Sequence, residues 1–130
     1  GLNHRYNLSD GILIKDNHVD FAGGIPQAVA ATKKYLKETG RNLRIEVEVR
    51  NTEEINQALA AGVDRIMLDN FTPERTREAV KLINGATEIE SSGGITLETL
   101  REYGECGVDY ISVGALTHSV KGLDMSFKAC

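Results

Sequence analysis

The sequence predicts an α/β protein in which strand-helix units repeat and build a parallel sheet. Strand-like apolar runs recur about every 22 residues after the first step, and a helix-like segment follows each of the first four runs. The turn Gly62-Val63-Asp64-Arg65-Ile66 is echoed by Gly107-Val108-Asp109-Tyr110-Ile111, about two strand-helix periods later. Because strands that alternate with helices at this spacing are typical of parallel sheets, we expect this fold class.

Five strands are expected from these apolar runs. They cover residues 12–15, 43–49, 65–68, 87–90 and 110–113. The polar stretch Asp16-Asn17-His18, which follows the first of them, is expected to form a loop.

The first two helices have start and stop signals. One begins near Pro26 and ends at Gly40, because proline suits the first helical turn and glycine suits the residue after the last turn. The next begins with a capping box, Asn51 with Glu54 three residues on, and ends at Gly62. The faces that these helices are expected to bury are Ile25, Ala28, Val29, Thr32 and Leu36 in the first, and Ile55, Ala58 and Leu59 in the second.

The last two helices are also signalled at their ends. Thr72-Pro73 is a cap followed by proline at the first helical position, and Thr96 is a cap for the final helix, which Gly104 and Gly107 end. The residues expected to face inward are Thr76, Ala79, Val80 and Ile83 in one, and Leu97 and Leu100 in the other.

The composition favours one domain of a cytoplasmic protein. A chain of 130 residues has the size of one ordinary domain. Its net charge of -4 argues against nucleic acid or an anionic membrane as a partner, and it has neither a membrane-spanning apolar run nor a secretory signal. Cys106 and Cys130 lack the spacing of a metal site, so both are expected to be reduced and chemically idle.

Two architectures are open to the predicted sheet. Five strand-helix steps are too few for an eight-stranded barrel, which takes about 250 residues, but they suffice for an open doubly wound sheet or for part of a barrel. Strand alternation places Glu46 and Glu48 on one face, opposite Ile45, Val47 and Val49. Since both faces of a doubly wound sheet are buried, two carboxylates on one face favour the barrel.

Polar residues and glycines gather at the carboxyl ends of the predicted strands, where both architectures build ligand sites. Ser91-Ser92-Gly93-Gly94 follows one strand and opens a helix, and Val113-Gly114-Ala115 follows the next strand. Such loops expose backbone N–H groups without obstructing side chains, and two in succession are typical of a phosphate cradle. The alternative for a single loop is a tight turn. The chain contains no dinucleotide-binding fingerprint and no Walker loop.

Charged residues of both signs complete the candidate site. His4, Arg5 and Lys15 are suited to binding carboxylates or phosphates. Glu48 and Asp69 are suited to sugar hydroxyls or to Mg²⁺. Together these residues indicate a phosphorylated sugar and an anionic partner as substrates, although each one alone also fits a surface or capping role.

Motifs along the chain resemble the quinolinate phosphoribosyltransferase family, the carboxylating nicotinate-nucleotide pyrophosphorylases. The resemblance runs from the first residue to about Asp124. It implies a seven-stranded α/β barrel, similar to a TIM barrel, of which this chain is the larger part. The motifs are Asn3-His4-Arg5, Leu8-Ser9-Asp10, residues 13–18, Glu46-Val47-Glu48-Val49, Met67-Leu68-Asp69-Asn70, residues 90–94 and residues 113–119.

The resemblance implies a reaction of NAD biosynthesis. Quinolinate would receive the phosphoribosyl group of phosphoribosyl pyrophosphate and lose a carboxylate, which gives nicotinate mononucleotide, CO₂ and pyrophosphate. Mg²⁺ would accompany phosphoribosyl pyrophosphate, mainly through the pyrophosphate, and no tightly bound organic cofactor is implied.

Roles for single residues follow from the matching motifs. His4 and Arg5 would hold the dicarboxylate, and Lys15 would lie where the carboxylate and phosphoribosyl groups meet. Glu48 and Asp69 would fix the ribose hydroxyls and the end of the substrate that bears Mg²⁺. The 5′-phosphate would be cradled by backbone groups of Ser92, Gly93, Gly94, Val113, Gly114 and Ala115.

The resemblance also implies parts that this chain lacks. Family members carry an N-terminal domain and a first barrel strand ahead of the Asn-His-Arg motif, and one subunit places an arginine in the other's site. Residues 1–130 are therefore expected to be a single C-terminal barrel segment that is inactive alone, from an enzyme that is a homodimer or a higher homo-oligomer. The alternatives are a molybdenum-transport-associated paralogue of the same barrel family and a non-catalytic, phosphate-binding half-barrel. Residues 15–18 and Leu68-Asp69-Asn70 favour the enzyme over the paralogue.

Overall fold

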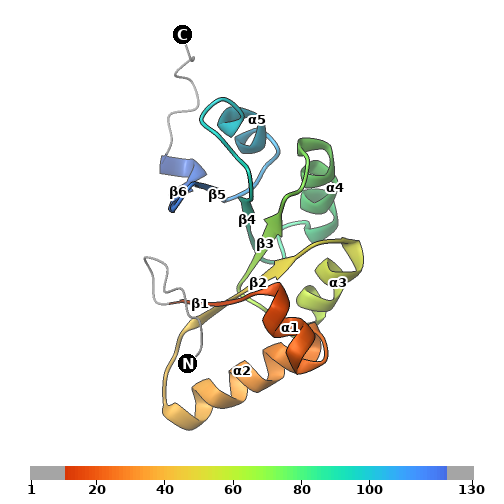
Figure 1. Cartoon of the computed structure of the whole chain (residues 1–130), viewed down its shortest axis with the longest axis vertical. Coiled ribbons are helices and arrows are strands. Elements are labelled where there is room, and N and C mark those ends of the chain that lie inside the picture. Colours follow the sequence, from red (N-terminus) through yellow and green to blue (C-terminus); the bar gives the residue numbers. More distant parts are fainter. Residues whose placement is uncertain (1–10, 123–130) are drawn as a thin grey trace. The chain divides into compact units, whose positions relative to one another are not determined.

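The computed structural model describes residues 11–122 of the chain. The chain divides into two units, Gly1–Ile66 and Met67–Cys130. Figure 1 labels the helices and strands of both units and colours them in chain order, from β1 in red to β6 in blue.

The first unit confirms the parallel strand-helix pattern. Its elements are β1 (Gly11–Ile14), α1 (Asp16–Ala22), α2 (Ile25–Thr39), β2 (Arg44–Val49) and α3 (Thr52–Ala61), and β3 (Arg65–Asp69) begins here and ends in the second unit. Strands β1 and β2 pair in parallel, with Gly11 opposite Arg44 and Ile14 opposite Val47. The three strands begin and end within one or two residues of the predicted positions.

Helix α1 corrects one expectation, because Asp16-Asn17-His18 forms its first turn rather than a loop. The backbone N–H groups of His18 and Val19 both donate to the Lys15 carbonyl at 3.0 Å. An acidic residue in the first turn is favourable, since the amino end of a helix carries partial positive charge. The helix has only 7 residues, too short for an apolar period to reveal it.

The predicted helix ends in the first unit are confirmed. Helix α2 ends at Gly40 and α3 at Gly62, both in the left-handed conformation that glycine adopts at little cost. At the start of α3 the Asn51 side chain accepts the Glu54 N–H at 2.9 Å, which is one half of a capping box. The Glu54 side chain accepts the N–H of Arg50 instead of that of Asn51, so the other half is shifted by one residue. Most of the expected faces lie inward, with Ile25, Ala28, Val29, Leu36, Ile55 and Ala58 buried. Thr32 and Leu59, which were expected with them, are only half-buried.

The second unit contains α4 (Pro73–Ile83), β4 (Glu88–Ser92), α5 (Leu100–Gly104), β5 (Tyr110–Val113), β6 (Leu116–Ser119) and a short 3₁₀ turn, Val120–Gly122. Strands β4 and β5 pair in parallel, as predicted. Strand β6 was not predicted, and it pairs antiparallel with β5 in a hairpin. Nowhere in residues 11–122 does a helix have the length and apolar character needed to cross a membrane.

Helix α5 corrects a second expectation. It begins at Leu100, and Thr96 belongs to a preceding turn in which its carbonyl accepts the N–H groups of Thr99 and Leu100. Leu97, expected to be buried, is 79% exposed, whereas Leu100 is buried as predicted. The glycines at 93 and 94 therefore lead into a turn, and a helix dipole at this loop is not part of the structure.

The internal sequence echo corresponds to a repeated pair of hydrogen bonds, one in each unit. In the first unit the Ile45 N–H donates to Asp64 Oδ2 at 2.8 Å, and the Asp64 N–H donates to the Ile45 carbonyl at 2.9 Å. In the second unit Ile89 and Asp109 make the same two bonds, both at 2.9 Å. Each aspartate thus ties the turn before one strand to the beginning of the neighbouring strand.

Candidate active site

The predicted site residues fall into two groups, one in each unit. Lys15 and Glu48 belong to the first unit. The second unit holds Asp69, Ser92, Gly93, Gly94, Val113, Gly114 and Ala115. His4 and Arg5 lie outside the described residues.

Lys15 and Glu48 lie at the carboxyl ends of β1 and β2. Lys15 is exposed and is the N-cap residue of α1. Glu48 is half-buried, and its Oε1 accepts the Asp16 N–H at 3.1 Å. Because Asp16 directly follows Lys15, this hydrogen bond fixes the backbone beside the lysine to the end of β2.

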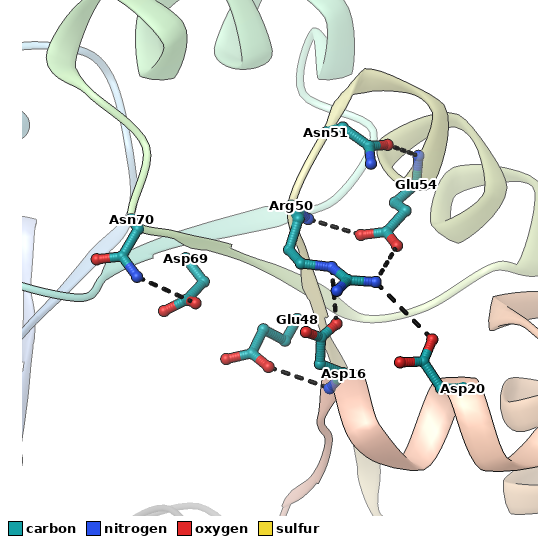
Figure 2. A network of polar contacts seen from close by, with 8 residues as sticks. All are labelled: Asp16, Asp20, Glu48, Arg50, Asn51, Glu54, Asp69 and Asn70. Atoms are coloured by element: carbon teal, nitrogen blue, oxygen red, sulfur yellow. Dashed lines mark hydrogen bonds and ion pairs between the residues drawn. The ribbon is translucent and has the colours of Figure 1, made fainter.

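Arg50, which was not predicted as a site residue, also connects α1 to the end of β2 (Figure 2). Its guanidinium contacts Asp16 at 3.0 Å and Asp20 at 3.8 Å on α1, and Glu54 at 3.1 Å on α3. The Arg50 N–H also donates to Glu54 Oε1 at 2.7 Å. The hydrogen bond to Glu54, followed by the negative charges of Glu54, Asp16 and Asp20, raises the pKa of Arg50. Of the residues in this cluster, Glu54 alone carried a signal in the sequence, as the glutamate of the predicted capping box.

In the second unit Asp69 lies against the first glycine loop. Asn70 follows it in the left-handed conformation (φ 60°), and the Asn70 N–H donates to the Ser92 carbonyl at 2.9 Å. Asn70 Nδ2 is 3.5 Å from Asp69 Oδ2 (Figure 2). A Cβ on Gly93 would lie 2.9 Å from Asp69 Oδ1 and 2.6 Å from Asn70 Oδ1, so the loop approaches this closely only because residue 93 is glycine.

The second glycine loop is the turn of the β5–β6 hairpin. Val113 pairs with Leu116, so Gly114 and Ala115 form a two-residue turn with φ 63° at Gly114. Glycine at the first central position is typical of a type II′ turn. Gly114 is exposed, and a Cβ there would meet nothing within 4 Å. The backbone of this loop is therefore accessible to a ligand.

A polar cluster, buried at Glu90 and half-buried at Ser112 and Thr117, lies at the base of both glycine loops, and it was not predicted. Glu90 on β4 is 1% exposed, and its Oε2 accepts the Ser112 hydroxyl at 2.5 Å. Ser112 on β5 is in turn 2.9 Å from the Thr117 hydroxyl on β6. Ser91, beside Glu90, is also buried, but its hydroxyl has no hydrogen-bond partner among the residues that the structure describes.

Within residues 11–122, no three His, Cys, Asp or Glu side chains are grouped so that they could hold a metal ion. The carboxylate oxygens of Glu48 and Asp69 are nevertheless of the donor type that Mg²⁺ prefers. Each of them, taken singly, suits an ion that arrives with a phosphorylated substrate, because most of the ligands of such an ion come from phosphate and water.

Comparison with known proteins places nearly the whole chain in one family. Residues 1–128 match the family model "Quinolinate phosphoribosyl transferase, C-terminal domain". The chain is 48% identical over 97% of its length to a probable carboxylating nicotinate-nucleotide pyrophosphorylase of Bacillus subtilis, and 46% identical over 98% to a chloroplastic one of Arabidopsis thaliana. It covers 43% and 41% of these proteins, so it spans about two fifths of the length of the curated relatives it matches.

A solved structure agrees. The nicotinate-nucleotide pyrophosphorylase of Francisella tularensis matches 88% of this chain with a TM-score of 0.76 and 46% sequence identity, and 40% of that protein is covered. The predicted fold class, α/β with parallel strand-helix repeats from the C-terminal part of the family barrel, is thereby confirmed. From the family model and the identities to these relatives, we conclude that the chain belongs to the family of quinolinate phosphoribosyl transferase C-terminal domains.

Proposed function

We propose that this chain supplies the C-terminal part of an enzyme that transfers a phosphoribosyl group from phosphoribosyl pyrophosphate to quinolinate and decarboxylates the product. The observation that carries the proposal is identity of 46 to 48% over nearly the whole chain to relatives named as carboxylating nicotinate-nucleotide pyrophosphorylases. The products are nicotinate mononucleotide, CO₂ and pyrophosphate.

The second unit binds the phosphoribosyl group in this proposal. Backbone N–H groups of residues 92–94 and 113–115 hold the 5′-phosphate, because both loops present backbone unobstructed by bulky side chains. Asp69 accepts hydrogen bonds from ribose hydroxyls. Its contact with Gly93 supports this role, since a carboxylate beside a phosphate-binding loop is placed to meet the attached sugar.

The first unit binds charged groups of both substrates in this proposal. Lys15 is an exposed cation at the end of β1 and attracts carboxylate or phosphate oxygens. Glu48, held by the start of α1, accepts hydrogen bonds from the ribose. His4 and Arg5 hold the two carboxylates of quinolinate. Mg²⁺ enters as part of the phosphoribosyl pyrophosphate substrate, where it neutralises charge on the departing pyrophosphate.

The chemistry needs no protein nucleophile. The quinolinate nitrogen forms a bond to the anomeric carbon while the bond from that carbon to pyrophosphate breaks. The bond to the 2-carboxylate then breaks, CO₂ leaves, and the electron pair remains on the ring carbon until a proton replaces the carboxylate. Lys15 stabilises the negative charge that develops in these steps, because a cation placed beside the reacting groups attracts that charge.

The wider setting is also part of the proposal. The curated relatives are more than twice as long as this chain, which supports the expectation that residues 1–130 are inactive by themselves. We propose that the active enzyme is a homodimer or higher homo-oligomer, on the resemblance of its motifs to the family. Its proposed place in the cytoplasm rests on the composition, which offers no apolar run long enough to span a membrane.

The test is an assay of the full natural protein that contains these 130 residues. Incubation with quinolinate, phosphoribosyl pyrophosphate and Mg²⁺ is expected to yield nicotinate mononucleotide, measured by chromatography. Lys15→Ala is expected to lower kcat/KM by about a hundredfold or more, as loss of a charge-stabilising group does. Lys34→Ala, which removes an exposed lysine of α2, is the matched control and is expected to leave it unchanged. A folded wild-type protein that forms no nicotinate mononucleotide would refute the proposal and favour the molybdenum-associated paralogue or a non-catalytic domain.

A further inference from the structure

We infer that Glu90, Ser112 and Thr117 form a hydroxyl relay that holds the two glycine loops of the second unit in place for the 5′-phosphate. They are positioning residues, because they act on the substrate through the loops. The inference rests on the proposed function in one respect only, the assignment of the two loops to a phosphate.

The direction of the relay follows from its proton count. A serine hydroxyl has one proton to donate, and that of Ser112 points to Glu90 Oε2 at 2.5 Å. The 2.9 Å contact between Ser112 and Thr117 therefore has Thr117 as donor and Ser112 as acceptor. One chain of hydrogen bonds thus runs from β6 through β5 to β4.

The relay lies where the backbone pairing between β4 and β5 ends. The register pairs Glu90 with Tyr110 and Ser91 with Ile111, and extends no further toward the loops within the described strands. Ser92 and Ser112, the residues that enter the two loops, thus lie beyond the ladder. The hydrogen bond from Ser112 to Glu90 joins the two strands on the loop side of this ladder. Beyond the last backbone pair, the two strands are therefore connected by side chains.

Burial makes this connection stiff. Glu90 is 1% exposed and Ser112 is half-buried, so water has little access to the carboxylate end of the relay. Thr117 lies directly opposite Ser112 in the hairpin register, and Val113 opposite Leu116, so the relay also anchors the turn at Gly114. A loop that is already ordered loses less entropy when it binds a phosphate, and its affinity is correspondingly higher.

The experiment uses the full natural protein and changes single hydroxyls, leaving Glu90 in place. Ser112→Ala breaks the middle of the relay. Thr117→Val removes its outer donor at nearly constant shape, and Thr117→Ser restores the donor. The matched control is Ser91→Ala, which removes a buried hydroxyl from β4 that makes no hydrogen bond within the described residues. The readouts are the Kd of ribose 5-phosphate by titration calorimetry and, separately, KM for each substrate.

We expect Ser112→Ala to weaken ribose 5-phosphate binding and to raise KM for phosphoribosyl pyrophosphate by about threefold to tenfold, the effect of one hydrogen bond. KM for quinolinate is expected to stay within about twofold of wild type, which a general loss of folding would not produce. Thr117→Val is expected to show a smaller change in the same direction, and Thr117→Ser and Ser91→Ala to bind like wild type. Should Ser112→Ala fail to fold, the pair of Thr117 variants decides.

The relay and the proposed function fail in different ways. Three results would overturn the relay even if nicotinate mononucleotide is formed. Ser112→Ala and Ser91→Ala could bind ribose 5-phosphate with equal affinity, or Thr117→Val and Thr117→Ser could do so. The wild type could also fail to bind ribose 5-phosphate. Binding of ribose 5-phosphate that weakens in the relay variants, in a protein that forms no nicotinate mononucleotide, would uphold the relay and reject the reaction.

Discussion

Gly93 is the glycine of the two loops whose replacement by alanine is expected to cost most activity. An added Cβ would lie 2.6 Å from Asn70 Oδ1, 2.8 Å from the Asn70 nitrogen and 2.9 Å from Asp69 Oδ1. Ordinary van der Waals contact begins at 3.4 Å, so these atoms must separate by about 0.5 to 0.8 Å. The Asn70 nitrogen is held by the Ser92 carbonyl, so relief requires the backbone that carries Asp69 to move.

The size of the effect follows from this displacement. A shift of about 1 Å in a catalytic group costs about a hundredfold in rate, so we expect Gly93→Ala to lower kcat/KM by about tenfold to a hundredfold. Both Gly93 (φ 89°) and Gly94 (φ 72°) are in the left-handed region, where alanine costs about 1 to 2 kcal/mol. At Gly94, however, a Cβ would meet only Asn70 Oδ1, at 3.9 Å. Gly94→Ala therefore has a similar backbone cost without the collision.

The assay compares the two variants in steady-state kinetics and in thermal denaturation. We expect similar losses of thermal stability and a clearly larger loss of kcat/KM in Gly93→Ala. Adding Asn70→Gly to Gly93→Ala removes the closest of the three atoms and is expected to restore part of the activity. If Gly93→Ala is as active as Gly94→Ala, the reasoning that residue 93 sets the position of Asp69 is wrong.

Three further predictions concern other parts of the chain. Arg50→Ala is expected to lower kcat/KM at low salt more than Arg50→Lys does. This difference should shrink at high salt, because exposed ion pairs are screened. A wild-type kcat/KM for Arg50→Ala at low salt would contradict the prediction. Asp64→Ala and Asp109→Ala should each lower the free energy of unfolding, measured by denaturant titration, by about 1 to 2 kcal/mol. The Asn variants should lower it by less, because they keep an acceptor oxygen. Unchanged stability of the Ala variants would show that these hydrogen bonds contribute nothing. Burial raises the pKa of both Tyr103 and Cys106, so the folded chain keeps protons that the unfolded chain releases. The stability that each group contributes is thus fully present below its ordinary pKa, and it is lost as pH rises through the raised pKa. A double variant Tyr103→Phe, Cys106→Ala should lose stability less steeply above about pH 9, where the two groups begin to titrate in the unfolded chain, and an identical slope there would count against the assignment.

Elements with strong local signals were predictable from the sequence. The cap Thr72-Pro73 and the glycines at 40 and 62 mark helix ends by their own backbone preferences, and the structure has helix ends at each of them. Helix α1 was missed because much of its support is tertiary. Its first turn is held by Glu48 and Arg50, which lie 32 or more residues further along the chain.

The candidate site was predictable in part for the same reason. Residues at strand ends, such as Lys15 and Asp69, are found by counting along a strand, and the structure has them there. The contact between Glu90 and Ser112 joins residues 22 positions apart, and no local pattern indicates it. The repeat that contains Asp64 and Asp109 is visible in the sequence. The sequence does not indicate that these carboxylates accept backbone N–H groups of the neighbouring strands, because Ile45 and Ile89 are 19 and 20 residues away.

The most direct test of the proposed function follows the carboxylate of quinolinate. Quinolinate labelled at its 2-carboxylate is incubated with the full natural protein, Mg²⁺ and phosphoribosyl pyrophosphate, and labelled CO₂, nicotinate mononucleotide and pyrophosphate are counted. We predict equal amounts of all three, and none without phosphoribosyl pyrophosphate. Absence of labelled CO₂ from a folded, ribose 5-phosphate-binding protein would contradict the proposed reaction.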